Sequence, residues 1–384
     1  MRKSEHPAEP KTQATTTPVQ PSDGDRKRLV SLDAFRGLTI FGMLLVNNIM
    51  LDEATPRHLR HAAWNEGLNF ADLVFPWFIF IVGVAIPYAV ASHRRKGLPL
   101  WKYDLRVLSR AMTLVLLGCL IDSSIYRRPI FDLNVLQLIG LAYLVAALLY
   151  ELPVSRRIII AAGFLLAHWA AIRFLPIPGV GKGVFTESQN FINHINQVYL
   201  NPYGLRGLAS VVTTSALAMI GTLVGDILRA EPDNRPRKLM YLVIGGAALT
   251  LIGWVWGRDL PFNKPLWTSS YIVFSAGLGA LVLGALYMII DVARWRAWAF
   301  PLVVFGMNAI MAYVAPILVK VYIFRDWMWT MPDGSNLPIG LAIPHWCYVR
   351  FGRVPGGWAY AAAYIFFWWL VLLQMYRKKV FLRV

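Results

Sequence analysis

A histidine on a polar loop, directly before a long apolar segment, is the residue in this sequence whose type and position best suit chemistry. His61 ends the stretch His-Leu-Arg-His at 58–61, and the apolar segment that follows begins near residue 71. Imidazole changes charge near neutral pH, so a histidine at a membrane boundary can move a proton or carry an acyl group. The alternative is a solvated loop histidine among basic neighbours.

The first apolar segment carries three polar residues that suggest a path for a ligand. Asp33 and Arg36 are three residues apart, so they share a helix face and can form an ion pair near one end of the helix. Asn47 lies roughly 16 Å farther along that helix. A slender ligand would meet a cation first and an amide later. The alternatives are a boundary ion pair with Arg36 reaching the interface, and an interhelical hydrogen bond for Asn47.

Other polar residues have structural interpretations of comparable or greater weight. His168 lies alone in an apolar segment, where a packing histidine is expected, and His194 belongs to the long loop 176–206. That loop is either solvated or covers a polar substrate. Close helix packing explains Asn308 as well as ligand contact does. Asp72 stands where it can cap the helix that begins near residue 71.

Composition identifies a polytopic membrane protein. Hydrophobic residues make up 57% of the 384-residue chain and charged residues only 15%, more apolar side chain than a soluble domain needs. The formal charge of +17 comes from short Lys and Arg clusters between apolar segments, which is typical of topology signals and excludes nucleic acid as the expected partner. Cys119 and Cys347 form neither a disulfide framework nor a metal-ligand spacing, so no metal is predicted.

The hydropathy pattern predicts an all-α fold of about ten transmembrane helices in one domain, residues 29–384. The tail 1–28 lacks apolar periodicity and is predicted to be a disordered cytoplasmic segment. A first span of roughly 20 residues follows Arg28. The other nine candidate spans are near 71–92, 107–123, 134–151, 157–175, 207–228, 239–257, 268–290, 300–319 and 358–376.

The Lys and Arg residues outside these spans predict the orientation. With Arg36 set aside as part of the first span, one side holds 24 of them and the other 13. The positive-inside rule then places both termini in the cytoplasm and His61 on the outer side. The chain shows no internal repeat or matching pair of interrupted helices, which argues against an inverted-repeat carrier.

Several long strings resemble the heparan-α-glucosaminide N-acetyltransferase family, particularly its bacterial members. They are Ser-Leu-Asp-Ala-Phe-Arg-Gly-Leu-Thr-Ile-Phe-Gly-Met-Leu-Leu-Val-Asn at 31–47, His-Ala-Ala-Trp-Asn at 61–65 and Ala-Asp-Leu-Val-Phe-Pro-Trp-Phe-Ile-Phe-Ile-Val-Gly at 71–83. Similarity continues at 135–143, 201–205, 263–271 and 305–309. It therefore covers nearly all of the chain after the tail.

The resemblance implies acetyl transfer across a membrane, from cytoplasmic acetyl-CoA to the amino group of a glucosamine-type sugar on the outer side. The family histidine matches His61 and the family asparagine matches Asn47. A base must take the ammonium proton and a donor must stabilise the tetrahedral oxyanion. We expect His61 to act as general base in direct transfer and Asn47 to hold the thioester carbonyl. A route through acetyl-His61 is the alternative.

The resemblance also implies partners and further site residues. Polar groups must accompany the pantetheine amides through the bilayer, and Arg36, Gln137, Ser269 and Asn308 are our candidates for lining that path. The implied location is the bacterial inner membrane, with a homodimer left open. Two other functions stay open: a permease for amino sugars or N-acetylglucosamine, with His61 coupling protons, and a membrane O-acyltransferase acting on an envelope glycan.

Overall fold

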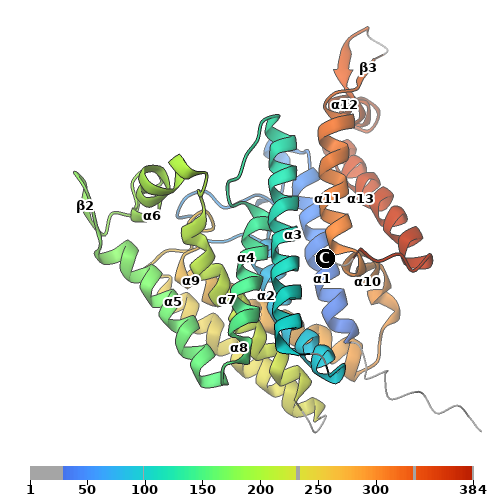
Figure 1. The fold of residues 1–384 in the computed structure, drawn as a ribbon. Helices are drawn as coiled ribbons and strands as arrows, with labels where there is room; N and C mark the ends of the chain where they lie inside the picture. The colour runs from blue at the N-terminus through green and yellow to red at the C-terminus, as the bar shows by residue number, and fades with distance from the viewer. Residues whose placement is uncertain (1–28, 98, 231–233, 332–333, 383–384) are drawn as a thin grey trace, which may run out of the picture.

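Long helices that run in alternating directions make up most of the protein (Figure 1). The computed structural model describes residues 29–97, 99–230, 234–331 and 334–382. The predicted disordered tail, residues 1–28, lies outside the described residues. The fold is mainly α-helical, as expected, with two short antiparallel hairpins.

The helices are α1 (Val30–Asn48), α2 (Phe70–Arg95), α3 (Leu100–Tyr126), α4 (Val135–Leu148), α5 (Val154–Phe174), α6 (Phe191–Ile195), α7 (Leu208–Arg229), α8 (Arg235–Trp256), α9 (Ser269–Leu286), α10 (Phe300–Met307), α11 (Ala309–Val319), α12 (Ile339–Phe351) and α13 (Arg353–Arg377). The hairpins pair β1 (Pro176–Ile177) with β2 (Gly181–Lys182), and β3 (Met328–Thr330) with β4 (Asn336–Pro338).

Fewer helices than the ten expected meet the length and composition of a membrane span. Within the described residues, seven do so: α1, α2, α5, α7, α8, α9 with its continuation, and α13. The pair α10 and α11 would be an eighth if its two halves, bent by 65°, form one span. Helices α3 and α4 occupy two of the predicted positions, but α4 is short and α3 begins with several charged residues. The count of ten is therefore not confirmed, and the orientation of the termini stays a prediction.

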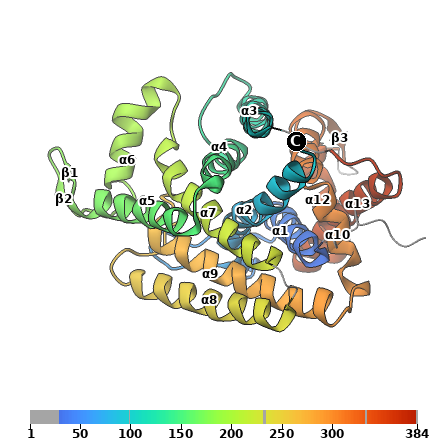
Figure 2. The same cartoon turned by 60° about the horizontal axis from the view of Figure 1, so that its bottom comes forward.

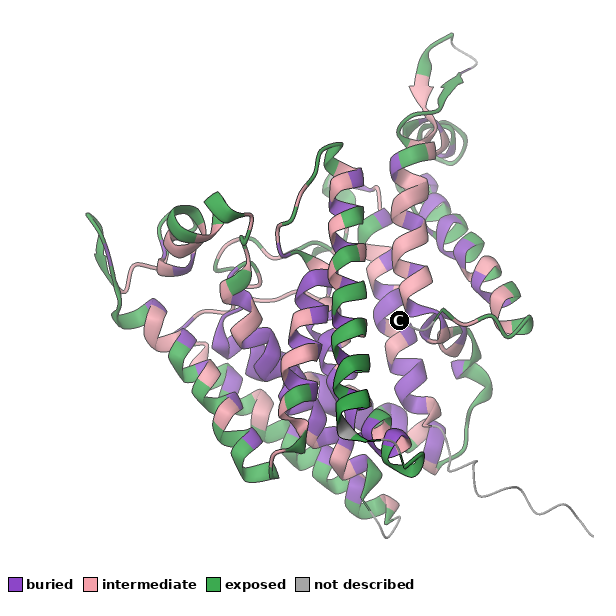
Figure 3. Cartoon of the chain, in the orientation of Figure 1, coloured by how far each residue is buried: buried purple, intermediate pink, exposed green. Residues whose placement is uncertain are grey.

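Helix α3 nevertheless presents a surface suited to lipid. Leu108, Met112, Leu116 and Leu120 follow one another at four-residue spacing, and each is about half exposed or more. Figure 3 shows the exposed face of α3 along most of the helix. Residues four apart share a helix face, so α3 turns a continuous apolar row away from the protein.

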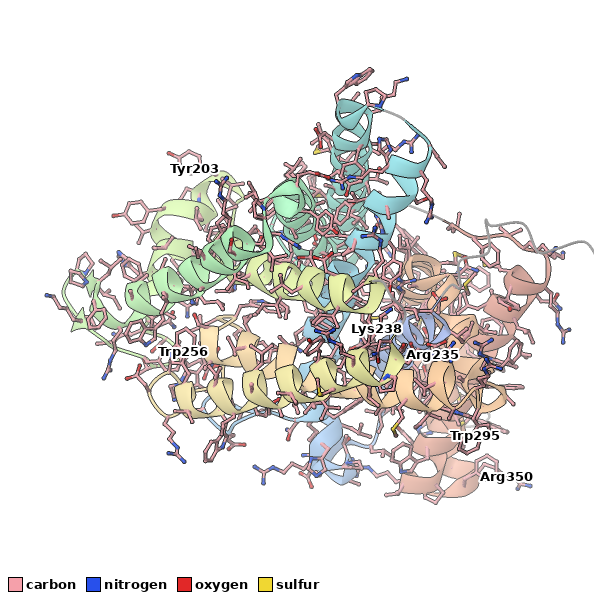
Figure 4. All side chains as sticks on the ribbon, turned by 90° about the horizontal axis from the view of Figure 1, so that it is seen from below. Tyr203, Arg235, Lys238, Trp256, Trp295 and Arg350 are labelled. Carbon is pink, nitrogen blue, oxygen red and sulfur yellow. The ribbon has the colours of Figure 1, made fainter. Side chains whose placement is uncertain are left out.

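The ends of α8 show the charge asymmetry that the orientation argument uses. Arg235 and Lys238 lie at its first turn, whereas Trp256 is at its other end (Figure 4). Arg94 and Arg95 end α2, which brings that helix to the same side. Basic residues on one side and an aromatic residue at the opposite boundary are typical of a membrane helix.

Glycines let α2 and α7 approach closely. A Cβ atom on Gly83 of α2 would lie 2.1 Å from the carbonyl oxygen of Ala218 in α7, and one on Gly221 would lie 2.4 Å from that of Phe80. Small residues at such crossings are the usual means of packing helices in a membrane. Figure 2 shows α8 beside α9, and α3 at the edge of the helix bundle.

Asn308 breaks the helix that hydropathy predicts across 300–319. Its backbone, at φ −124° and ψ 45°, leaves the helical region between α10 and α11. Its side chain binds the C-terminal segment instead: Nδ2 donates to the Val380 oxygen at 3.1 Å, and Oδ1 accepts from the Leu382 nitrogen at 3.1 Å. This amide thus holds the end of the described chain against the helix break.

We predict that Gly83→Ala destabilises the protein, because the added methyl group clashes with the backbone of α7. The expected loss is about 2 kcal/mol, seen as a lower midpoint of thermal unfolding in detergent. Gly163→Ala in α5 is the matched control, since a Cβ there has no heavy atom within 4 Å. Equal midpoints for the two variants would contradict the close crossing of α2 and α7.

Candidate functional site

His61 and Asp72 form a hydrogen-bonded pair where the loop after α1 meets α2. The His61 Nδ1 atom lies 2.8 Å from Asp72 Oδ1. The carboxylate is almost fully buried, with 3% of its side chain exposed, whereas 52% of the His61 side chain is exposed. A carboxylate on Nδ1 favours the tautomer with the proton on that atom and leaves Nε2 as the acceptor. The pair therefore presents a base to its surroundings.

The backbone around Asp72 fixes this carboxylate. Its Oδ2 atom accepts hydrogen bonds from the backbone nitrogens of Ala62, at 3.0 Å, and Asn69, at 3.1 Å. The Tyr271 hydroxyl of α9 donates to the Asp72 carbonyl oxygen at 2.5 Å. An acidic residue in the first turn of a helix also interacts favourably with the helix dipole. Asp72 thus ties the His61 loop to α2 and, through its backbone, to α9.

Lys264, on the loop between α8 and α9, is the third charged member of the site. Its Nζ atom lies 3.1 Å from His61 Nδ1, 3.5 Å from His61 Nε2 and 3.7 Å from Asp72 Oδ1. About a quarter of its side chain is exposed. Burial lowers the pKa of the Lys264 ammonium from its ordinary value, while the Asp72 carboxylate acts in the opposite direction.

A cavity of about 1380 Å³ connects these residues with the opposite end of α1. His61 and Lys264 line one end of the cavity. Arg36 of α1 and Arg110 of α3 line the opposite end. Between them the walls come from α1, α2, α4 and α11, with the polar loops 187–196 and 262–267 beside His61. A volume of this size exceeds what most drug-sized ligands need. It suits a long, flexible molecule that runs between the two ends.

The structure places four of the predicted site residues along this cavity: Arg36, Asn47, His61 and Asp72. Asn47 is exposed at the last turn of α1, and its carbonyl oxygen accepts from Lys320 Nζ at 3.2 Å. Arg36 also forms the expected ion pair with Asp33, at 3.4 Å. The side chain of Arg36 is one-quarter exposed, so its guanidinium can meet both Asp33 and a ligand.

The other three candidates for the donor path are buried in the helix packing. Gln137 Nε2 donates to Asp122 Oδ2 at 2.7 Å, and Ser269 Oγ donates to the Leu165 oxygen at 2.7 Å. Asn308 holds the C-terminal segment, as described above. None of the three is among the described residues that line the cavity. Their role along the donor path stays a prediction.

The sequence did not predict that Lys264 belongs to the site, or that Asp72 forms a hydrogen bond with His61. Lys264 contacts His61 across 203 positions of sequence, a separation that no local pattern reveals. Asp72 was assigned to the helix start, where it does accept a backbone hydrogen bond, but one carboxylate oxygen also faces His61. The short spacing between His61 and Asp72, an acidic residue at the beginning of a membrane helix, could have indicated that the two side chains pair.

Together these groups can support transfer of an acyl group to an amine. A base oriented by a carboxylate takes the proton of the attacking amine, and amide or cationic groups stabilise the oxyanion that forms. Apolar side chains of α1, α2 and α4 line the middle of the cavity. The cationic end of the cavity, at Arg36 and Arg110, suits an anionic group such as a phosphate.

Comparison with known proteins gives one family match and two curated relatives. The family described as heparan-alpha-glucosaminide N-acetyltransferase, catalytic, matches residues 28–204. The chain is 26% identical over 429 residues to heparan-alpha-glucosaminide N-acetyltransferase of Homo sapiens, covering 93% of this chain and 60% of that protein. It is also 26% identical over 371 residues to the Mus musculus protein of the same name, covering 78% of this chain and 55% of the relative.

These matches support membership of the heparan-alpha-glucosaminide N-acetyltransferase family, as the resemblance in the sequence predicted. The chain spans somewhat more than half the length of the two curated relatives. The matched region of the family profile contains α1, α2 and the His61 loop, and so most of the candidate site.

We predict that Asp72→Ala loosens the His61 loop, because the Ala62 and Asn69 amides lose their common acceptor. Hydrogen exchange of the peptide covering 61–69 should accelerate on the order of tenfold or more. Glu66→Ala, which removes a carboxylate of the same loop, is the control and should leave this exchange unchanged. Equal exchange in the two variants would show that Asp72 does not hold the loop.

Proposed function

From its similarity to this family, we propose that the chain is a transmembrane N-acetyltransferase. It takes an acetyl group from cytoplasmic acetyl-CoA and transfers it to the amino group of a glucosamine-type sugar at the outer side of a bacterial cytoplasmic membrane. The observation that carries the proposal is the Asp72–His61 pair at one end of a cavity whose lining also includes Arg36 and Arg110. A donor that must deliver its acetyl group across a membrane needs a cavity that runs along the helices, whereas a soluble acetyltransferase does not.

The chemistry of the donor suits the residues that line the cavity. The phosphates of coenzyme A are anionic and would stay near the basic residues at the N-terminal end of α1, where Arg36 and Arg110 line the cavity. The pantetheine arm is slender and would extend past the apolar walls of α1 and α2. Its thioester would then reach the level of Asn47 and His61. This placement keeps the charged part of the donor out of the bilayer interior.

The acceptor fits the opposite end. Polar residues that a sugar can hydrogen-bond line the cavity beside His61, namely Asn193, Asn196 and Asn263. Trp64 lines the same end and packs against Phe185, with ring centroids 5.4 Å apart. Aromatic faces and amide side chains are suited to the apolar and hydroxyl-bearing surfaces of a sugar ring.

The chemistry follows from the protonation pattern of the pair. The acceptor amine attacks the thioester carbonyl carbon, and His61 Nε2 takes the proton that the nitrogen releases. Asp72 accepts from Nδ1 and stabilises the imidazolium that forms. The Asn47 amide donates to the carbonyl oxygen as it becomes an oxyanion. Collapse of the intermediate breaks the C–S bond, and the proton passes from His61 to the thiolate of coenzyme A.

Direct transfer is favoured over an acetyl-His61 intermediate by the way the ring is held. Asp72 engages Nδ1, and Lys264 lies within 3.5 Å of both ring nitrogens. An acetyl group on Nε2 would occupy the ring nitrogen that must take the proton of the attacking amine. Direct transfer leaves that nitrogen available as the base.

We predict that His61→Ala abolishes glucosamine-dependent release of coenzyme A while acetyl-CoA still binds. Asp72→Asn should lower kcat about 10²-fold to 10⁴-fold, because the amide cannot stabilise the imidazolium. His58→Ala is the matched control, since His58 is exposed on the same loop outside the described cavity lining. Activity and binding are measured on full-length protein in detergent.

Unchanged turnover in His61→Ala would overturn the proposed role of His61. Acetyl-CoA binding without any transfer in the wild type would overturn the acetyltransferase itself and favour a permease.

A further inference from the structure

Lys264 places an amine beside the proposed base. Among the described residues, its Nζ is the amine in hydrogen-bonding contact with the His61 ring, at 3.1 Å from Nδ1 and 3.5 Å from Nε2. Lys264 also lines the cavity in which the thioester would lie. A general base must come within hydrogen-bonding distance of the proton it removes. The Lys264 amine therefore occupies the kind of position that the acceptor amine needs.

The surroundings of Lys264 increase its reactivity. Burial lowers the pKa of its ammonium, although the Asp72 carboxylate 3.7 Å away opposes this change. A lower pKa increases the fraction of neutral amine, which is the nucleophilic form. Nζ already lies 3.5 Å from Nε2, and about a quarter of the side chain is exposed, so a small rotation can bring the amine to that nitrogen. A tethered nucleophile also reacts at a high effective concentration.

We propose that Lys264 is a modification site, an internal acetyl acceptor that the enzyme acetylates when no amino sugar is bound. The inference rests on the proposed function. The neutral Lys264 amine attacks the carbonyl carbon of acetyl-CoA, and His61 takes the proton from the nitrogen. The C–S bond breaks, coenzyme A leaves as the thiol after receiving that proton, and an acetyl-lysine amide remains. No reactant other than the acetyl thioester is required.

Acetylation of Lys264 would stop further turnover. The amide carries no charge, so its ion pair with Asp72 is lost. The added acetyl group also extends from Nζ into the space beside His61, where the acceptor binds. Amino sugar bound at that place would separate Lys264 from the base and protect it. The enzyme would thus switch itself off when acetyl-CoA is present and the acceptor is not.

This site changes how acceptor-independent release of coenzyme A is interpreted. One equivalent released without sugar would arise from an acetyl-Lys264 product as well as from an acetyl-His61 intermediate. The two differ in fate, because an amide persists whereas an acyl-imidazole hydrolyses or passes its acetyl group to glucosamine. Lys264→Arg removes the acceptor nitrogen of the first route and keeps the positive charge.

The experiment incubates full-length wild-type protein in detergent with acetyl-CoA, with and without glucosamine, and maps acetyl-lysine by mass spectrometry. Lys182 of β2, exposed on the same side of the protein, is the reference for chemical acetylation without the enzyme. We expect Lys264 to be acetylated on the order of tenfold or more above Lys182. Glucosamine and the His61→Ala substitution should each suppress this signal. Preincubation with acetyl-CoA should reduce later turnover of the wild type but not of Lys264→Arg.

Each contrary result has one interpretation. If glucosamine is acetylated and Lys264 is modified no more than Lys182, the inference is wrong while the proposed function stands. If Lys264 is acetylated equally in His61→Ala, the reaction is chemical and the inference is also wrong. If neither glucosamine nor Lys264 is acetylated in a folded sample that binds acetyl-CoA, the proposed function itself fails.

Discussion

The burial of one carboxylate organises the end of this protein that carries His61. Asp72 is almost entirely removed from water, and an ionised carboxylate in such a place must be compensated by hydrogen bonds and opposite charge. Ala62 and Asn69 supply backbone donors, His61 supplies a ring nitrogen, and Lys264 supplies the nearby cation. Satisfying this one group draws the His61 loop, the beginning of α2 and the loop before α9 into a single cluster. The proposed base is oriented as a consequence.

The helix packing explains why the cluster can face a long cavity. Glycine contacts bring α2 against α7 and α1 against α10, and a Cβ on Gly37 would lie only 1.7 Å from the Leu302 oxygen. These close crossings make the packing dense on one side of α1 and α2. On their other side, residues of α3, α4 and α11 line the cavity together with residues of α1 and α2. Dense packing therefore fixes the two helices that carry Asn47 and Asp72, while the opposite wall leaves room for a ligand.

Local patterns predicted the helices better than they predicted the contacts between them. Apolar segments gave the positions of the long helices, because each must bury or expose a continuous apolar surface. Residue type and family resemblance indicated His61 and Asn47, and both line the cavity. Lys264 was not predicted, since its contact with His61 depends on how α9 packs against α2. The sequence left Asn308 open to helix packing or ligand contact, and its hydrogen-bond partners Val380 and Leu382 lie more than 70 positions away. The short helix α6 and the two hairpins carry too few apolar residues to show a period.

We propose that one cavity carries an acetyl group between the two sides of a membrane. The most direct measurement reconstitutes the protein in sealed vesicles, selects one orientation by tag accessibility, and supplies acetyl-CoA and glucosamine on opposite sides. Our interpretation predicts N-acetylglucosamine in the compartment that holds glucosamine when acetyl-CoA is on the side of Arg36 and Arg110, with no product when the two reactants are exchanged. Transfer that occurs only with both reactants on the same side would contradict it.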